Sequence, residues 1–214
     1  MSAPSAALPI DPACFALLDD CHATAAAPSS RLYGGLVRVH RCADPCALEE
    51  MWAAVDADLR TGLHAVVLAD YEWGVRLNGV VYAGPQPERD GGLRVLMFAT
   101  LQKLSTVAVE SWLAAEIDEA PAGALGLRAS VDRAAFEEAI ARIHHAIAEG
   151  ETYQVNYSYR LDFETFGSPL ALYRRLRARQ PVGFGSVIRL PAGAGGPDWV
   201  LSCSPELFLR HHDG

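Results

Sequence analysis

The chain has 214 residues, of which 50% are hydrophobic, so it can form one large domain or two small ones with a buried core. Its net charge of −8 argues against a nucleic-acid partner, because phosphate attracts basic surfaces. No apolar run approaches the roughly 20 residues that cross a bilayer, and the first residues lack a secretory signal pattern. We therefore expect a soluble, cytoplasmic protein with no nucleic-acid or membrane partner.

Short apolar runs separated by polar breaks predict the first strands. Residues 1–12 are rich in Ala, Pro and Ser and are expected to form a disordered tail. Strands are predicted at residues 15–18, 32–41, 63–70 and 93–98. The run at 63–70 is nearly all apolar, so we expect it in the centre of a sheet. The Pro- and Gly-rich residues 84–92 predict a turn between two strands.

Capping residues and apolar spacing predict the helices. Asp44 and Pro45 are typical of a helix start, and the pattern that follows them ends at Gly62. A helix is also predicted at 106–119. The predicted helix with the clearest boundaries is capped by Ser130 or Asp132 and ends at Gly150, and a last one opens at Ser168-Pro169.

The second half of the chain contains further predicted strands. Residues 120–129 are rich in Pro, Gly and Ala and predict a connection between subdomains. Residues 152–161 alternate with period two, which is typical of a strand. Residues 184–190 and 199–202 predict a hairpin. The phrase from Ser202 to Arg210 predicts a strand, a Ser-Pro turn that carries Glu206, and a second strand.

These elements predict an α+β fold with mostly antiparallel sheets and helices packed outside them, because strands come in neighbouring pairs with helices between. The expected domains are residues 13–129 and residues 130–214. The five cysteines are an odd number at irregular spacing, which does not indicate a disulfide framework. Cys42, Cys46 and His40 lack a second ligand pair at zinc spacing, so no metal ligands are predicted.

Two polar features have alternative interpretations. Gln154, Asn156, Ser158 and Arg160 share one face of the predicted strand 152–161, either as a solvated face or as the wall of a cleft. Glu206 is either a surface residue or a carboxylate held at a rigid strand junction, where desolvation would raise its pKa and suit it to donate a proton.

Several phrases, in order along the chain, resemble the chorismate-binding enzyme family. They are Phe15 to Asp20, Asp70 to Gly74, Ile147 to Asn156, Leu172 to Arg177, Pro181 to Val187 and Ser202 to Phe208. The similarity is strongest from about residue 132 onward. The phrase Tyr153-Gln154-Val155-Asn156 is more similar to the aminodeoxychorismate synthase component I branch than to anthranilate synthase component I.

The resemblance implies a reaction and a role for Glu206. Ammonia from a glutamine amidotransferase partner would replace the 4-hydroxyl of chorismate and give 4-amino-4-deoxychorismate, a precursor of p-aminobenzoate and folate. Mg²⁺ would neutralise the carboxylates of the substrate, and Glu206 would be the general acid/base. The alternatives are an anthranilate synthase component I or isochorismate synthase fragment, and a non-catalytic module that binds a ligand or the glutaminase.

The resemblance also implies an incomplete catalytic region, the first half of the anthranilate synthase component I-like fold. The branch has a ring-attacking lysine in a phrase after the Glu206 strand, whereas Lys103 is the only lysine here and matches no such phrase. The metal-binding glutamates are likewise expected beyond this chain. Asp213-Gly214 indicates a hairpin turn without a second strand. We therefore expect the isolated chain to be inactive and to fold poorly.

The family's amino-terminal region often contains a tryptophan pocket. The resemblance places that pocket at Asp20, where the family has a serine, and at Gly183, Phe184 and Gly185. Asp19 adds a second carboxylate beside Asp20. Two carboxylates would repel the carboxylate of an amino acid, so the sequence predicts weakened tryptophan binding.

Overall fold

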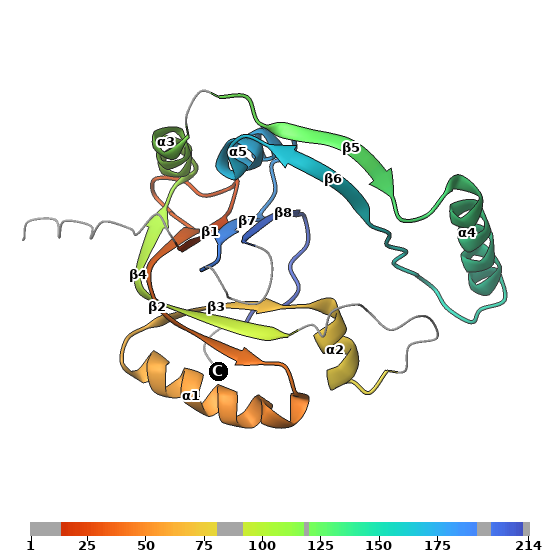
Figure 1. Cartoon of the computed structure of the whole chain (residues 1–214), viewed down its shortest axis with the longest axis horizontal. Helices are drawn as coiled ribbons and strands as arrows, with labels where there is room; N and C mark the ends of the chain where they lie inside the picture. Colours follow the sequence, from red (N-terminus) through yellow and green to blue (C-terminus); the bar gives the residue numbers. More distant parts are fainter. Residues whose placement is uncertain (1–13, 81–91, 118–119, 192–197, 212–214) are drawn as a thin grey trace, which may run out of the picture. The chain divides into compact units, whose positions relative to one another are not determined.

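The computed structural model describes residues 14–80, 92–117, 120–191 and 198–211 (Figure 1). The chain divides into two compact units, Met1–Glu116 with Tyr173–Gly214, and Ile117–Leu172. The strands are β1 (Phe15–Asp19), β2 (Ser30–Cys42), β3 (His64–Ala69), β4 (Leu93–Leu104), β5 (Gly123–Ala129), β6 (Leu161–Phe166), β7 (Phe184–Arg189) and β8 (Trp199–Ser204). The helices are η1 (Pro45–Ala47), α1 (Leu48–Arg60), α2 (Tyr71–Leu77), α3 (Thr106–Glu116), α4 (Arg133–Ala148) and α5 (Pro169–Arg179).

The first unit is built on a six-stranded sheet with the order β3-β4-β2-β1-β7-β8. Every pair of neighbouring strands in it is antiparallel. Strands β1 and β2 are joined by a loop, whereas β1 and β7 are neighbours although far apart in sequence (Figure 1). The predicted α+β fold with antiparallel sheets is confirmed.

Strand β4 is buried on both faces along residues 93–98. Its side chains at 95 and 97 pack with Met51 and Val55 of α1 and with Trp73 of α2. The alternate side chains at 96 and 98 pack against the other core, which includes Ala16 of β1. Because successive strand residues point to opposite faces, an unbroken apolar run is what a strand covered on both sides requires.

Strand β3 corrects one prediction, since it lies at the edge of the sheet rather than in its centre. Its apolar composition has the same cause as that of β4. Ala65 packs on the core beneath α1, while Val66 and Leu68 pack on the opposite core. The apolar run of β3, in which Val67 is nevertheless 47% exposed, was interpreted as a central position.

The predicted helix starts are confirmed in the first unit, with one addition. The Asp44 carboxylate accepts a hydrogen bond from the Cys46 backbone N–H at 2.9 Å, which caps η1 and leads into α1. Residues 71–77 form the short helix α2, for which the sequence analysis predicted no element. The turn predicted at 84–92 lies almost wholly outside the described residues, as does the predicted tail 1–12.

In the second unit, the antiparallel pair β5–β6 and helix α4 are the regular elements that the structure describes. Residues 123–129 form strand β5, so the prediction of a connection without a strand at 120–129 was wrong. The sequence analysis had interpreted the glycines and alanines of this segment as an interruption of secondary structure. Helix α4 begins as predicted, because the Asp132 carboxylate accepts a hydrogen bond from the Ala135 N–H at 2.8 Å. The predicted division at residue 130 falls between β5 and α4 and stays a prediction.

The strand predicted at 152–161 is not formed, and β6 begins only at Leu161. Residues 153–160 have no neighbouring strand in the described part of the chain. Tyr157 and Tyr159 pack instead on α4, where the Phe136 ring lies 5.8 Å and 5.9 Å from their rings, whereas Tyr153 is 92% exposed. The alternation at 157 and 159 thus reflects which side chains face the helix, not a hydrogen-bonded strand.

The predicted hairpin at 184–202 is confirmed as β7 and β8. The second strand predicted after the Ser-Pro turn is not formed, because β8 ends at Ser204 and residues 205–211 have no strand structure. The predicted turn at Asp213-Gly214 lies outside the described residues. In the described part of the chain, no helix is both long and apolar enough to span a membrane.

Candidate ligand-binding site

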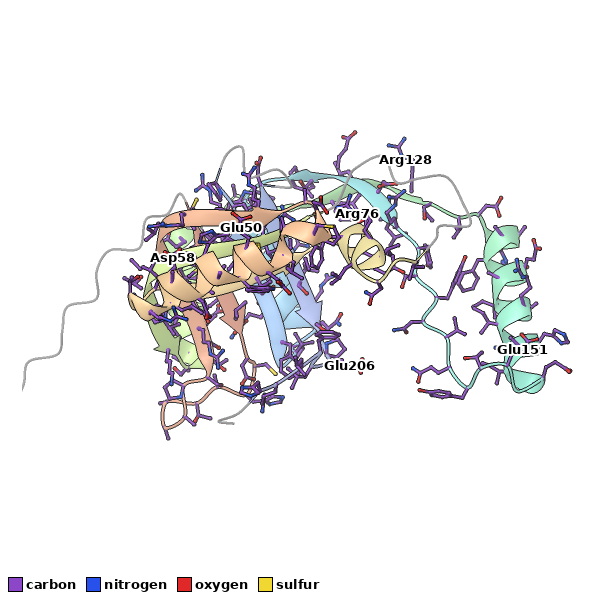
Figure 2. All side chains as sticks on the ribbon, turned by 90° about the horizontal axis from the view of Figure 1, so that it is seen from below. Glu50, Asp58, Arg76, Arg128, Glu151 and Glu206 are labelled. Carbon is purple, nitrogen blue, oxygen red and sulfur yellow. The ribbon has the colours of Figure 1, made fainter. Side chains whose placement is uncertain are left out.

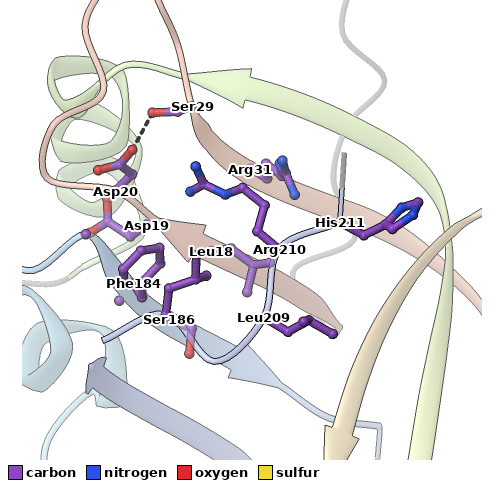
Figure 3. Close-up of a pocket in the computed structure, with 13 residues that line it drawn as sticks. Leu18, Asp19, Asp20, Ser29, Arg31, Phe184, Ser186, Leu209, Arg210 and His211 are labelled. Carbon is purple, nitrogen blue, oxygen red and sulfur yellow. Dashed lines mark hydrogen bonds between the residues drawn. The ribbon is translucent and has the colours of Figure 1, made fainter. Parts of the chain in front are cut away.

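A cavity of about 650 Å³ lies in the first unit where the end of β1 meets the start of β7 (Figure 3). The register of the sheet creates this junction, since Asp19 is opposite Gly185 and Leu18 is opposite Ser186. Segment 207–211, which follows β8, forms another wall. The residues that line the cavity are Leu18, Asp19, Asp20, Ser29, Arg31, Gly183, Phe184, Gly185, Ser186, Leu207, Leu209, Arg210 and His211.

The structure brings together the four residues predicted for an amino-acid pocket. Asp20, Gly183, Phe184 and Gly185 come from segments more than 160 residues apart, and all four line this cavity. Strand pairing between β1 and β7 explains their proximity. Glu206 is not among the lining residues.

Asp20 is held as a carboxylate in the lining of the cavity. The Ser29 hydroxyl donates a hydrogen bond to its Oδ2 at 2.6 Å, and the His22 backbone N–H donates one to its Oδ1 at 2.9 Å. Burial alone would raise the pKa of Asp20, but these two hydrogen bonds and the charges of His22 and Arg210 outweigh it, and the pKa is lowered. Asp20 therefore presents a negative charge at neutral pH.

Asp19, by contrast, is 5% exposed and is compensated within the protein. The Arg177 Nε donates a hydrogen bond to its Oδ2 at 2.6 Å, and the Tyr173 hydroxyl donates to the same oxygen at 3.1 Å. Burial raises the pKa of Tyr173, and the Asp19 carboxylate raises it further, so the phenol stays protonated as a donor. The expected joint repulsion by Asp19 and Asp20 is thus reduced to the charge of Asp20.

Sequence reasoning missed the role of helix α5 in this site. It included Tyr173 and Arg177 only in the phrase Leu172 to Arg177 that resembles the family, and assigned no role to either side chain. One signal was available: Asp19 ends a strand that is otherwise apolar, and a buried carboxylate needs a cationic partner. The arginine-rich helix 169–179 is the segment richest in such cations.

Positive charge enters the cavity from two other segments. Arg31 projects from β2, and Arg210 from segment 207–211 extends toward Asp20 (Figure 3). A cavity with a carboxylate near guanidinium groups is suited to a small zwitterion, whose ammonium and carboxylate groups need opposite partners. The site is therefore electrostatically compatible with an α-amino acid.

Glu206 lies on the exposed segment after β8 (Figure 2). The Ser204 hydroxyl donates a hydrogen bond to the Glu206 backbone carbonyl at 3.1 Å, which shapes the turn but leaves the carboxylate exposed. The desolvated strand junction expected for this residue is not formed, because no second strand follows it. Its catalytic role stays a prediction.

Exchange of Gly185 for alanine is expected to cost about 1–3 kcal/mol of unfolding free energy, because it overpacks a filled site. An added Cβ would lie 2.7 Å from the Tyr173 hydroxyl oxygen and would push that donor away from Asp19. Gly183→Ala is the matched control, since its nearest atoms would be at 3.8 Å and 4.0 Å. Urea unfolding of both variants measures the difference, and equal stabilities would contradict the expected close contact.

Comparison with known proteins defines the class. The family model described as chorismate binding enzyme matches residues 51–214. The chain is 35% identical over 88 residues to anthranilate synthase component 1 of Streptomyces coelicolor, covering 41% of this chain and 16% of that protein. It is 38% identical over 79 residues to aminodeoxychorismate synthase of Streptomyces griseus, covering 37% and 10% of the two chains. The corresponding Streptomyces pristinaespiralis protein is 33% identical over 93 residues, 44% of this chain and 12% of that protein.

The chain belongs to the chorismate binding enzyme family, since the match covers well over half of it. The resemblance inferred from the sequence phrases is therefore confirmed. The segments matched in these three relatives amount to less than a fifth of each relative's length. Relatives from both the anthranilate and the aminodeoxychorismate branches are similar to it.

Proposed function

We propose that this chain is part of component I of an aminodeoxychorismate synthase. Membership of the chorismate binding enzyme family supports chorismate as the substrate. The observation that favours this branch is Asn156 in the phrase Tyr153-Gln154-Val155-Asn156, where the anthranilate branch usually has a second valine. The proposed product is 4-amino-4-deoxychorismate, and a glutamine amidotransferase subunit is the proposed source of ammonia.

Glu206 supplies the proton chemistry in this proposal. The 4-hydroxyl of chorismate is a poor leaving group, so its departure needs a proton from a neighbouring acid. The carboxyl group of Glu206 is accessible on segment 205–211, and a substrate that approaches this segment can reach it. After the hydroxyl has left, the Glu206 carboxylate accepts the proton that the incoming nitrogen loses.

Mg²⁺ is proposed as the cofactor because chorismate carries two carboxylates, whose charge a divalent cation would offset. The residues that the structure describes do not fit such a site. In that part of the chain, the group of potential ligands that lie close together contains a thiol and an imidazole, whereas Mg²⁺ prefers oxygen ligands. No step is therefore assigned to the metal.

The test is to identify the product formed by the whole gene product from chorismate. With ammonia and Mg²⁺, the proposal predicts 4-amino-4-deoxychorismate, resolved by liquid chromatography and mass spectrometry. A purified glutaminase subunit with glutamine is expected to replace free ammonia. Formation of anthranilate or isochorismate would contradict the proposed branch, and absence of chorismate binding in calorimetry would contradict the substrate.

A second candidate function is supported by the cavity at β1 and β7, for which we propose tryptophan as the ligand. Its support is the convergence of Asp20, Gly183, Phe184 and Gly185 on one cavity that also contains Arg210. Calorimetry with L-tryptophan tests it, with Arg210→Met and the surface variant Arg60→Met as a matched pair. Weaker binding in Arg210→Met alone is expected, whereas equal affinities would place the ligand elsewhere.

A further inference from the structure

Three side chains that can ligate a metal converge on the turn after β1. Asp20, Cys21 and His22 each offer one ligand atom, and these atoms all lie within 4.8 Å of one another. The proposed reaction uses none of them, although Asp20 also lines the cavity proposed for tryptophan. We propose that this turn binds one divalent transition-metal ion of the zinc class, independently of the Mg²⁺ that the reaction is proposed to use.

The backbone of this turn is fixed before any ion binds. The Cys21 N–H donates a hydrogen bond to the Val182 carbonyl at 3.0 Å, and the Ala23 N–H donates to the Asp20 carbonyl at 3.1 Å. The Thr106 N–H and hydroxyl both donate to the Ala23 carbonyl, at 3.0 Å and 2.8 Å. Because these bonds hold the backbone of the turn, little backbone entropy remains to be lost when its side chains gather round an ion.

The surroundings of the ligand atoms also suit a metal. The Ser29 hydroxyl holds the Asp20 carboxylate at 2.6 Å, which is the kind of outer hydrogen bond that orients metal-ligating carboxylates. Gly183 lies beside the turn, where an added Cβ would be in ordinary contact with the His22 ring at 3.8 Å and with Asp20 Oδ1 at 4.0 Å. His22 is exposed, so a fourth position is open to water or to a small ligand.

The kinds of ligand atom in this turn determine which metal ion is expected to bind. One sulfur, one imidazole nitrogen and one carboxylate oxygen match the ligands of Zn²⁺ and of its spectroscopic substitute Co²⁺. Mg²⁺ and Ca²⁺ prefer oxygen donors and are not expected to compete. The three ligands are consecutive in sequence, so the site depends on one turn.

The purified, metal-free chain is titrated with CoCl₂ while absorption from thiolate-to-cobalt charge transfer is recorded. We expect one saturable site whose absorption is displaced by ZnCl₂ and unaffected by MgCl₂. Cys21→Ser is expected to abolish the charge-transfer band, and His22→Gln to weaken Co²⁺ binding at least tenfold. Ser29→Ala is expected to weaken it by about tenfold, as loss of an outer hydrogen bond does.

Two control variants separate this turn from other cysteines and histidines. Cys46 and His144 are exposed elsewhere in the chain, so Cys46→Ser and His144→Gln are expected to leave the titration unchanged. His22→Gln changes an exposed side chain and is expected to keep the circular dichroism spectrum of the parent. Absence of a charge-transfer band, its survival in Cys21→Ser, or its loss in Cys46→Ser would each overturn the proposal.

Discussion

Glu206→Gln is expected to lower the turnover of chorismate by about 10²–10⁴-fold, the usual contribution of a general acid/base. Glutamine keeps the size and polarity of the side chain but cannot give a proton to the departing hydroxyl. Because the carboxylate is exposed and its turn is held by the Ser204 hydroxyl, which donates to the Glu206 backbone carbonyl, the fold is expected to be unchanged. The assay uses the whole gene product with ammonia, so that the glutaminase step does not limit the rate.

The controls for Glu206 distinguish proton transfer from simple loss of charge. Glu149→Gln removes an exposed carboxylate from the end of α4 and is expected to leave turnover within about twofold. The dissociation constant of chorismate is expected to stay within a few-fold in Glu206→Gln, since the loss lies in the chemical step. A variant that keeps normal turnover, or that loses only affinity, would show that Glu206 is not the general acid/base.

Local signals in the sequence predicted the parts of the fold that depend on local interactions. Asp44 was identified as a helix cap, and Asp132 as one of two candidate caps beside Ser130, because a short polar side chain before an apolar pattern can accept a hydrogen bond from the first turn. The hairpin β7–β8 followed from two apolar runs around a glycine-rich break. In these cases the neighbouring residues decide the structure.

The errors came from features that depend on distant partners. The edge position of β3 is set by β4 pairing on one side only, and nothing in residues 64–69 records that. Residues 152–160 alternate as a strand does, but a strand needs a neighbour to accept its hydrogen bonds. The segment after Ser204 also has no neighbouring strand among the described residues, and Glu206 is therefore exposed.

The candidate cavity was likewise predictable only in part from the sequence. Resemblance to a family placed Asp20, Gly183, Phe184 and Gly185 in one pocket, and the pairing of β1 with β7 brings them together. The cation that compensates Asp19 could not be assigned from the sequence, because several arginines of α5 are equivalent in a helical pattern. Only the tertiary structure distinguishes Arg177, whose side chain is 14% exposed, from Arg174 at 44%.

Arg177→Met is expected to lower the free energy of unfolding of the first unit by about 3–5 kcal/mol, because it leaves the buried Asp19 carboxylate without its cation. Methionine keeps much of the apolar length of the arginine side chain, so the loss reports mainly on charge. The hydroxyls of Tyr173 and Ser30 still donate to Asp19 but carry no charge. The protein's four tryptophans all lie in the first unit, so fluorescence during urea unfolding follows that unit.

Arg174→Met is the matched control. Arg174 lies on the same helix as Arg177, both residues pair with Glu110, and the exchange is the same. Arg174 pairs with Glu110 at the surface, where both side chains are more than 40% exposed, and such a pair contributes about 0–1 kcal/mol. Asp19→Asn combined with Arg177→Met is expected to cost less than the sum of the single changes, because neither charge is then left buried alone. Strictly additive losses, or equal losses in Arg174→Met and Arg177→Met, would mean that Asp19 is not stabilised by Arg177 and that the negative charge beside Asp20 is not offset.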